Sequence, residues 1–61
     1  MVEMKRIEEN VTEIKFSNKQ NKFFIEQLKF IGATPTKESS RYTYFWFNGS
    51  FADCKRYLGI G

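Results

Sequence analysis

The chain has 61 residues and a formal net charge of +3, and it contains one cysteine, Cys54, and no histidine. A chain of this length makes a single domain, residues 1–61, with a marginal core, because it buries only about 60% of the surface that its unfolded form exposes. This composition excludes an internal disulfide and the usual ligands of a zinc site, so we expect no metal, no cofactor and, without the usual catalytic groups, no enzyme activity.

The N-terminal part of the chain alternates between apolar and polar side chains, which is typical of strands. The alternation is clearest around Ile14 and Phe16, which fall on one face of a predicted strand. Val2 and Met4 line an earlier strand in the same way. The polar residues 8–10 are expected to form the turn between the two strands.

The next segment predicts the main helix of the domain. Ser17 followed by Gln20 fits a capping box, in which two side chains satisfy the free N–H groups at the start of a helix. Gly32 is expected to end the helix. The apolar residues between them recur at the helical spacing i, i+4, i+7: Phe24, Leu28 and Ile31.

The same helix carries a second aromatic stripe, formed by Phe23 and Phe30. A helix with 3.6 residues per turn places this stripe roughly 100° away from the main apolar stripe. A simple amphipathic helix does not need a second stripe. Either the helix lies between two layers of the fold, or the stripe is an interface.

Residues 33–36 are predicted to be extended, and Pro35 restricts this segment to a sheet edge or to the beginning of a strand. Residues 37–40 are expected to form a turn. A strand is predicted over residues 41–47, because nearly every side chain in this segment is aromatic or β-branched.

The C-terminal segment predicts a short helix. Asn48-Gly49 taken alone would indicate a hairpin, but a second capping-box pattern begins at Ser50 and is followed by apolar residues at helical spacing. Gly59 ends this helix, which places Ile60 to pack back on Cys54. We expect Cys54 to be a buried packing residue rather than a reactive thiol.

These elements follow the order β(β)–α–(β)β–α and predict an α+β fold. The expected architecture is a small antiparallel sheet of three or four strands, with the main helix across one face and the short C-terminal helix at the edge. In an alternative arrangement, both helices pack on the same face, and the other face of the sheet is left open.

The predicted strand over residues 41–47 also supplies the main candidate site. Side chains alternate with period two along a strand, which separates Phe45 and Phe47 from the other aromatic residues. Because Tyr and Trp carry polar groups and Phe does not, we expect the phenylalanines to face the core. The residues on the opposite side then face water: Tyr42, Tyr44 and Trp46.

Three interpretations of these aromatic residues stay open. In the first, the N-terminal strand or the C-terminal helix covers them. In the second, they bind a protein partner or a second copy of the chain, with Phe23 and Phe30 as a further contact surface, because Tyr and Trp are enriched at interface hot spots. In the third, they stack on nucleic-acid bases beside four basic residues: Lys37, Arg41, Lys55 and Arg56.

We therefore expect a small binding or regulatory protein that acts by protein–protein interaction, as an inhibitor or adaptor. The interaction is with a different protein or, in a homodimer, with a second copy of the chain. Its size is typical of the stand-alone regulators that phages and mobile elements encode. The alternatives are a small nucleic-acid-binding module and a structural subunit of a larger assembly. Without an apolar signal segment or a stretch of about 18–20 apolar residues, and with a lone cysteine, the sequence predicts a cytoplasmic protein that does not enter a membrane.

Overall fold

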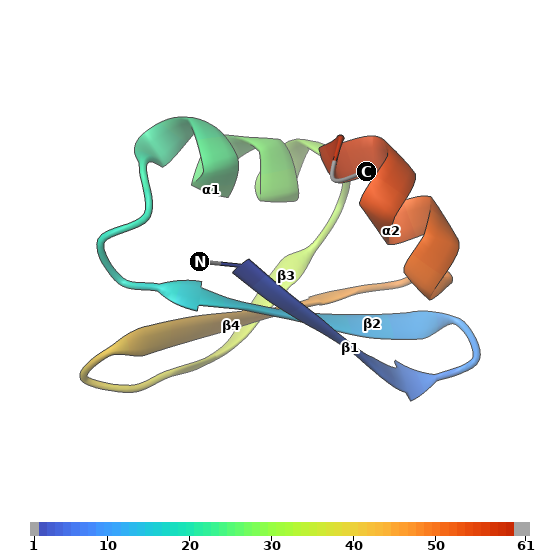
Figure 1. The fold of residues 1–61 in the computed structure, drawn as a ribbon, viewed down its shortest axis with the longest axis horizontal. Helices are drawn as coiled ribbons and strands as arrows, with labels where there is room; N and C mark the ends of the chain where they lie inside the picture. Colours follow the sequence, from blue (N-terminus) through green and yellow to red (C-terminus); the bar gives the residue numbers. More distant parts are fainter. Residues whose placement is uncertain (1, 60–61) are drawn as a thin grey trace.

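The computed structural model describes residues 2–59, which form a four-stranded antiparallel sheet and two helices (Figure 1). The strands lie side by side in the order β1-β2-β4-β3. The predicted α+β fold and the predicted order of elements are confirmed. The elements along the chain are β1 (Val2–Glu8), β2 (Val11–Ser17), α1 (Lys22–Phe30), β3 (Thr34–Glu38), β4 (Tyr42–Phe47) and α2 (Phe51–Leu58).

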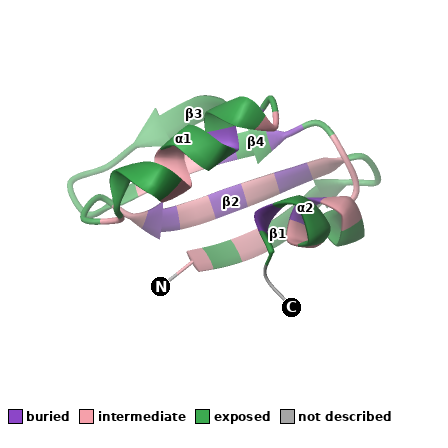
Figure 2. Ribbon diagram, turned by 90° about the horizontal axis from the view of Figure 1, so that it is seen from above, coloured by how far each residue is buried: buried purple, intermediate pink, exposed green. Residues whose placement is uncertain are grey.

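Both helices lie on the same face of the sheet, which we call the inner face (Figure 2). The short helix α2 packs over β1 and β2, and α1 crosses the sheet beside it. The second of the two predicted arrangements is therefore the one observed. The opposite face, which we call the open face, has no helix over it in the part of the chain that is described.

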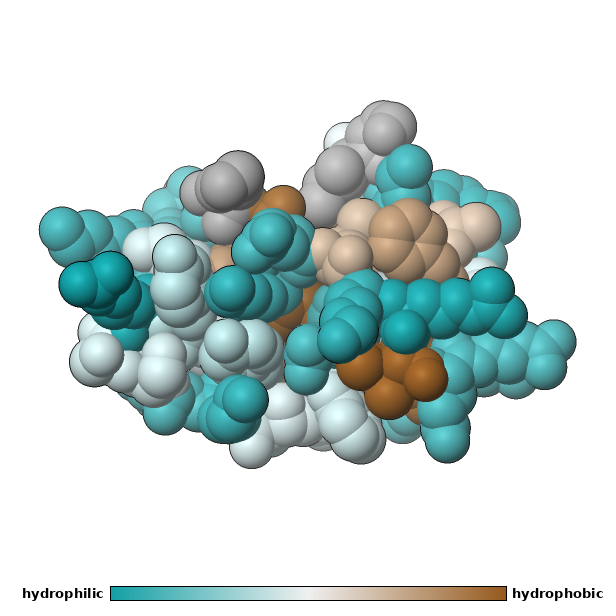
Figure 3. Space-filling view, turned by 60° about the horizontal axis from the view of Figure 1, so that its bottom comes forward, coloured by the Kyte–Doolittle hydropathy of each residue, from teal (hydrophilic) through white to brown (hydrophobic). Residues whose placement is uncertain are grey.

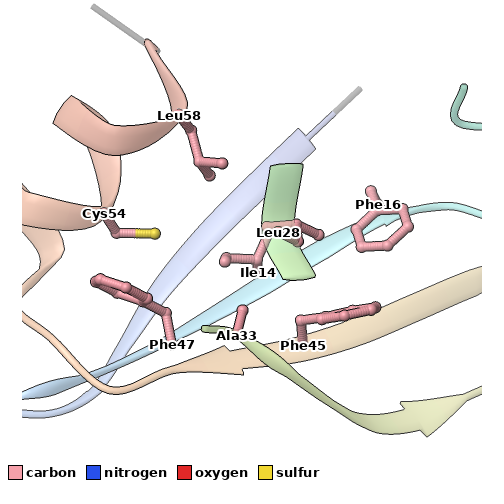
Figure 4. Close-up of a cluster of buried hydrophobic side chains, with 8 residues drawn as sticks. All are labelled: Ile14, Phe16, Leu28, Ala33, Phe45, Phe47, Cys54 and Leu58. Atoms are coloured by element: carbon pink, nitrogen blue, oxygen red, sulfur yellow. The ribbon is translucent and has the colours of Figure 1, made fainter. Parts of the chain in front are cut away.

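The core fills the space between the inner face and the helices (Figure 4). Phe45 and Phe47 point into it, as predicted, and the ring of Phe16 meets the ring of Phe24 edge-on at 5.3 Å between centroids. The main apolar stripe of α1 thus packs on the sheet. The buried apolar side chains are Ile14, Phe16, Leu28, Ala33, Phe45, Phe47, Cys54 and Leu58.

Helix α1 begins later than predicted. Ser17 is still paired with β4, and its Oγ accepts a hydrogen bond from the N–H of Lys19 at 3.2 Å. The helix is capped instead by Asn21, whose side chain accepts a hydrogen bond from the N–H of Phe24 at 3.0 Å. The predicted capping box of Ser17 and Gln20 is wrong, because strand pairing extends to Ser17 and keeps this segment out of the helix.

The turn before β4 is also shifted from its predicted position. Residues 37 and 38 belong to β3, so the turn covers residues 39–41, and β4 begins at Tyr42. A bulge between Pro35 and Lys37 lets β3 continue past the proline while it keeps its pairing with β4. Pro35 lies on an edge strand of the sheet, as predicted.

Helix α2 begins and ends where the sequence predicts. Ser50 accepts a hydrogen bond from the N–H of Asp53 at 3.1 Å, and Gly59 takes the left-handed conformation with φ of 69°. The predicted contact of Ile60 with Cys54 lies outside the described residues.

The connection from β4 to α2 is held close to the sheet. A Cβ atom on Gly49 would clash with the buried ring of Phe47, so glycine is required at this position. The Gly49 carbonyl accepts a hydrogen bond at 3.1 Å from the hydroxyl of Thr12, which is fully buried in β2. These two contacts fix the start of α2 over the β2 side of the sheet.

Candidate interaction surfaces

The open face displays the three aromatic residues that the alternation of β4 turns away from the core. Tyr42 is 38% exposed and Trp46 is 41% exposed, whereas Tyr44 is half-buried. Figure 3 shows the molecule with this side brought forward: hydrophilic side chains (teal) lie among atoms of intermediate hydropathy (white), with smaller hydrophobic groups (brown) between them. No second layer built from residues 2–59 covers the three aromatic residues, so the first of the three interpretations does not describe this structure.

The two tyrosines of the open face are partly covered by lysine side chains from neighbouring strands. The Nζ atom of Lys15 lies 4.3 Å from the centre of the Tyr42 ring, and that of Lys37 lies 4.5 Å from the centre of the Tyr44 ring. Both distances are within the range of cation–π attraction, which contributes about 0.5–1 kcal/mol at exposed sites. The tyrosines therefore have favourable contacts inside the monomer.

Acidic side chains complete the contacts of the open face. Trp46 donates a hydrogen bond from Nε1 to the carboxylate of Glu13, opposite it on β2, at 3.3 Å. Glu3 of β1 forms an ion pair with Lys15 at 3.4 Å. This contact with the Glu3 carboxylate raises the pKa of Lys15 above its usual value.

Sequence reasoning missed the contribution of β2 to the open face. The signal was present in the alternation of this strand, because the period that buries Ile14 and Phe16 turns Glu13 and Lys15 to the other side. Which aromatic residue each of them meets depends on the register between β2 and β4, and the pattern of a single strand does not contain that register.

Two of the four basic residues predicted for nucleic-acid binding lie near the aromatic residues. Lys37 reaches Tyr44. Arg41 lies in the turn beside Tyr42, and Arg41 and Tyr42 line a shallow depression. The same depression contains the carboxylate-bearing residue Glu3. This end of the open face therefore carries charges of both signs.

The other two basic residues, Lys55 and Arg56, lie on α2, on the opposite side of the sheet from the open face. Arg56 forms an ion pair with Asp53 at 2.9 Å, and the Nζ atom of Lys55 lies 5.8 Å from the centre of the Phe51 ring. The structure does not bring the predicted basic residues together on one surface.

A second aromatic surface lies on α1 and is formed by Phe23 and Phe30, which we call the α1 ridge. These side chains are 83% and 91% exposed. Both project from the helix away from Leu28, which is fully buried under it. Of the two explanations that the sequence left open, a helix between two layers is not what the described residues show.

The α1 ridge stands on a helix that is fixed to the rest of the domain. Gln27, between the two phenylalanines along the helix, donates a hydrogen bond from Nε2 to the backbone carbonyl of Tyr57 in α2 at 3.1 Å. The ring of Tyr57 meets the ring of Phe47 edge-on at 5.8 Å between centroids. The hydrogen bond of Gln27 thus ties α1 to α2, and the ring contact of Tyr57 ties α2 to β4.

Cys54 is fully buried between α2 and the sheet, as expected for a packing residue (Figure 4). Burial raises the pKa of its thiol above the usual value. Among residues 2–59, no three His, Cys, Asp or Glu side chains are grouped so that they could hold a metal ion. Neither described helix is long and apolar enough to cross a membrane.

Comparison of the chain with known proteins found no match to a protein family, to a curated protein or to a solved structure.

Proposed function

We propose that the protein is a small cytoplasmic binding protein that recognises another protein through the α1 ridge. The observation that carries this proposal is the exposure of Phe23 and Phe30, at 83% and 91%. Isolated exposed apolar residues are ordinary on protein surfaces, but here two phenylalanines on one short helix, two turns apart, present their large apolar side chains on the same face. The burial of Cys54 and the lack of histidine support a binding role rather than a catalytic one.

The helix presents the ridge in a fixed orientation. Phe24 and Leu28 pack against the core below, and Gln27 is hydrogen-bonded to α2. A binding surface that is already ordered before it meets its partner loses less conformational entropy on association. The ridge therefore has the rigidity that an interface hot spot needs.

The geometry of the ridge also describes the partner. Phe23 and Phe30 are seven residues apart, which separates them by about 10 Å along the helix axis. This is the spacing with which helices insert apolar anchors into a hydrophobic groove. Lys22, Glu26 and Lys29 lie exposed beside the ridge. We expect a protein partner with two apolar pockets and a polar rim.

The proposal is tested by affinity capture from extracts of the source cells, with three forms of the protein. The wild type is compared with the double variant Phe23→Ala/Phe30→Ala and with the matched double variant Lys22→Ala/Lys29→Ala, which changes the same helix without touching the ridge. We expect one protein to be retained by the wild type and by the lysine variant, and to be lost with the phenylalanine variant.

The captured protein is then purified, and its affinity for each form is measured by titration calorimetry. Loss of both phenylalanines is expected to weaken binding at least 100-fold, because truncation of a hot-spot residue typically costs 2 kcal/mol or more, roughly 30-fold for each site. Equal affinities for all three forms would contradict the proposal. A loss of binding on Tyr44→Ala but not on the ridge variant would move the interface to the open face.

A second candidate function is binding of single-stranded nucleic acid on the open face. It is favoured by the row of strand-borne aromatic residues with Lys15 and Lys37 beside them. Bases that stack on Trp46 would quench its fluorescence, and the affinity would fall steeply with salt concentration. Unchanged fluorescence on addition of a mixed-sequence oligonucleotide at low salt would reject this function.

A further inference from the structure

The outer edge of β1 is an unpaired edge of the sheet, because β1 is hydrogen-bonded only to β2 among the described strands. Such an edge presents a row of free backbone N–H and C=O groups that can pair with another strand. The strand is regular from Val2 to Arg6, and a bulge interrupts its register between Arg6 and Glu8. The stretch that can pair regularly is therefore five residues long, with Met4 at its centre.

The side chains of this stretch are divided between the two faces of the sheet. Glu3 and Lys5 lie on the open face, opposite Lys15 and Glu13 of β2. Val2 and Met4 lie on the inner face, where they pack against the edge of the core and are partly buried. A partner strand would thus meet charged groups on one face and apolar groups on the other.

We propose that two copies of the chain associate through the outer edges of their β1 strands, antiparallel and with Met4 opposite the partner's Met4. A two-fold axis perpendicular to the sheet then places Glu3 opposite the partner's Lys5, and Lys5 opposite the partner's Glu3. Directly opposed residues in an antiparallel pair have their Cβ atoms about 4.5–5.5 Å apart, so both opposite-charge pairs are in contact. The interface is isologous and closes as a dimer.

The neighbouring registers lack this complementarity. A two-fold axis at Glu3 places Glu3 against the partner's Glu3, and an axis at Lys5 places Lys5 against the partner's Lys5. Each puts like charges directly opposite, which is destabilising. Each also shortens the regular pairing to fewer than five residues. Only the Met4-centred register uses the whole regular stretch and pairs opposite charges.

The charges of the two sheets also continue each other across this edge. Lys15 and Glu3 already form an ion pair in the monomer. In the dimer the row extends from Lys15 and Glu3 to the partner's Lys5 and then to its Glu13, so that the sign alternates at every step. On the inner face, the partly buried Met4 side chains meet each other and remove their remaining apolar surface from water.

The decisive experiment uses two charge reversals, Glu3→Lys and Lys5→Glu, in sedimentation equilibrium over a wide range of protein concentration. Each variant alone places like charges opposite each other twice in its own dimer, and we expect its dissociation constant to rise about tenfold or more. In an equimolar mixture, every pair between the two variants again joins opposite charges. The mixture is therefore expected to recover dimerisation close to that of the wild type.

A second experiment tests the register by cross-linking under mild oxidation. Met4→Cys is expected to form a disulfide-linked dimer, because opposed residues have their Cα atoms about 4.5–5.5 Å apart, within the range that a disulfide spans. Glu3→Cys and Lys5→Cys are expected not to link, since neither faces its own copy. The buried Cys54 supplies no competing thiol. This experiment decides the proposal if the charge variants do not fold.

The α1 ridge variant Phe23→Ala/Phe30→Ala serves as the control and is expected to dimerise like the wild type. A wild-type protein that stays monomeric at all concentrations would overturn the proposal. So would a dimer that tolerates both charge reversals, a mixture without recovery, cross-linking only through residue 3 or 5, or a dimer that is lost with the ridge variant.

Discussion

The open face and the α1 ridge both expose aromatic side chains, but they differ in what surrounds those side chains. On the open face, Tyr42 and Tyr44 contact lysine side chains, and Trp46 donates a hydrogen bond to Glu13. On α1, Phe23 and Phe30 are more than four-fifths exposed. Aromatic exposure alone therefore does not identify an interface, because strand-borne aromatic residues can stabilise the sheet that carries them.

The strongest destabilisation is predicted for the packed side of α1, in contrast to its exposed ridge. Leu28→Ala removes a fully buried side chain between the helix and the sheet, and we expect it to lower the free energy of unfolding by about 2–5 kcal/mol. Urea denaturation followed by circular dichroism measures the change. If Phe30→Ala destabilised the protein as much as Leu28→Ala, the distinction between the packed side of α1 and its ridge would be lost.

A smaller effect is expected on the open face. Tyr44→Ala removes a half-buried cross-strand neighbour of Lys15 and the ring that Lys37 covers, which should cost about 1 kcal/mol of stability. The matched variant Lys37→Ala removes only the cation and should cost about half as much. The same denaturation experiment checks both variants. A Tyr44→Ala protein with unchanged stability would show that the open-face contacts do not stabilise the monomer.

The thiol of Cys54, beneath α2, reports whether the core between the sheet and the helices excludes solvent. Because burial raises its pKa above the usual 9.0, both states keep the proton well below pH 9.0, and the thiol adds no pH dependence there. Above pH 9.0 the unfolded chain loses this proton first, so stability is expected to fall as pH rises towards the folded-state pKa. The midpoint of urea unfolding, measured from pH 7 to pH 10, should fall more in the wild type than in Cys54→Ala.

The matched variant isolates the contribution of the thiol from that of every other group in the protein. Equal pH profiles for the two proteins would show that the thiol is not protected by burial. The same thiol reports on the surface variants: Tyr44→Ala should speed its labelling by a disulfide reagent about fivefold, as expected for a loss of about 1 kcal/mol in stability.

On the ridge side of α1, a small change in the free energy of unfolding is expected, in the stabilising direction. Phe23→Ala and Phe30→Ala should leave the free energy of unfolding unchanged or raise it by up to about 0.5 kcal/mol each, because alanine has the higher helix propensity and little packing is lost. Thermal unfolding at low protein concentration measures the shift. A loss of more than 1 kcal/mol would mean that the ridge contributes to the monomer core.

Much of the fold is readable in the sequence because several local signals agree. The aromatic alternation of β4 predicts which side faces the core, and Ser50 with Asp53 predicts the start of α2. The start of α1 was missed, because Ser17 and Gln20 have the spacing of a capping box while Ser17 pairs with β4. That competition is decided by a strand far along the chain, and a local pattern does not contain it.

The candidate site was predictable only in part for the same reason. Exposure of the β4 aromatic residues follows from their period, and the second stripe of α1 pointed to the ridge. The side of the sheet that carries Lys55 and Arg56 depends on how α2 folds back, so their separation from Tyr44 was not predictable. The pairing of Glu3 with Lys15 depends on the register of the first hairpin, which a bulge near Arg6 shifts.

The two edge strands of the sheet, β1 and β3, differ in how readily another strand can pair with them. At β3, Pro35 offers no N–H group, and the bulge beside it breaks the regular spacing of the backbone groups. A sheet that grows by joining two β1 edges therefore has a β3 strand at each of its ends. Further strand pairing is hindered at both β3 edges. A concentrated solution of this aromatic-rich protein should therefore contain dimers rather than fibres.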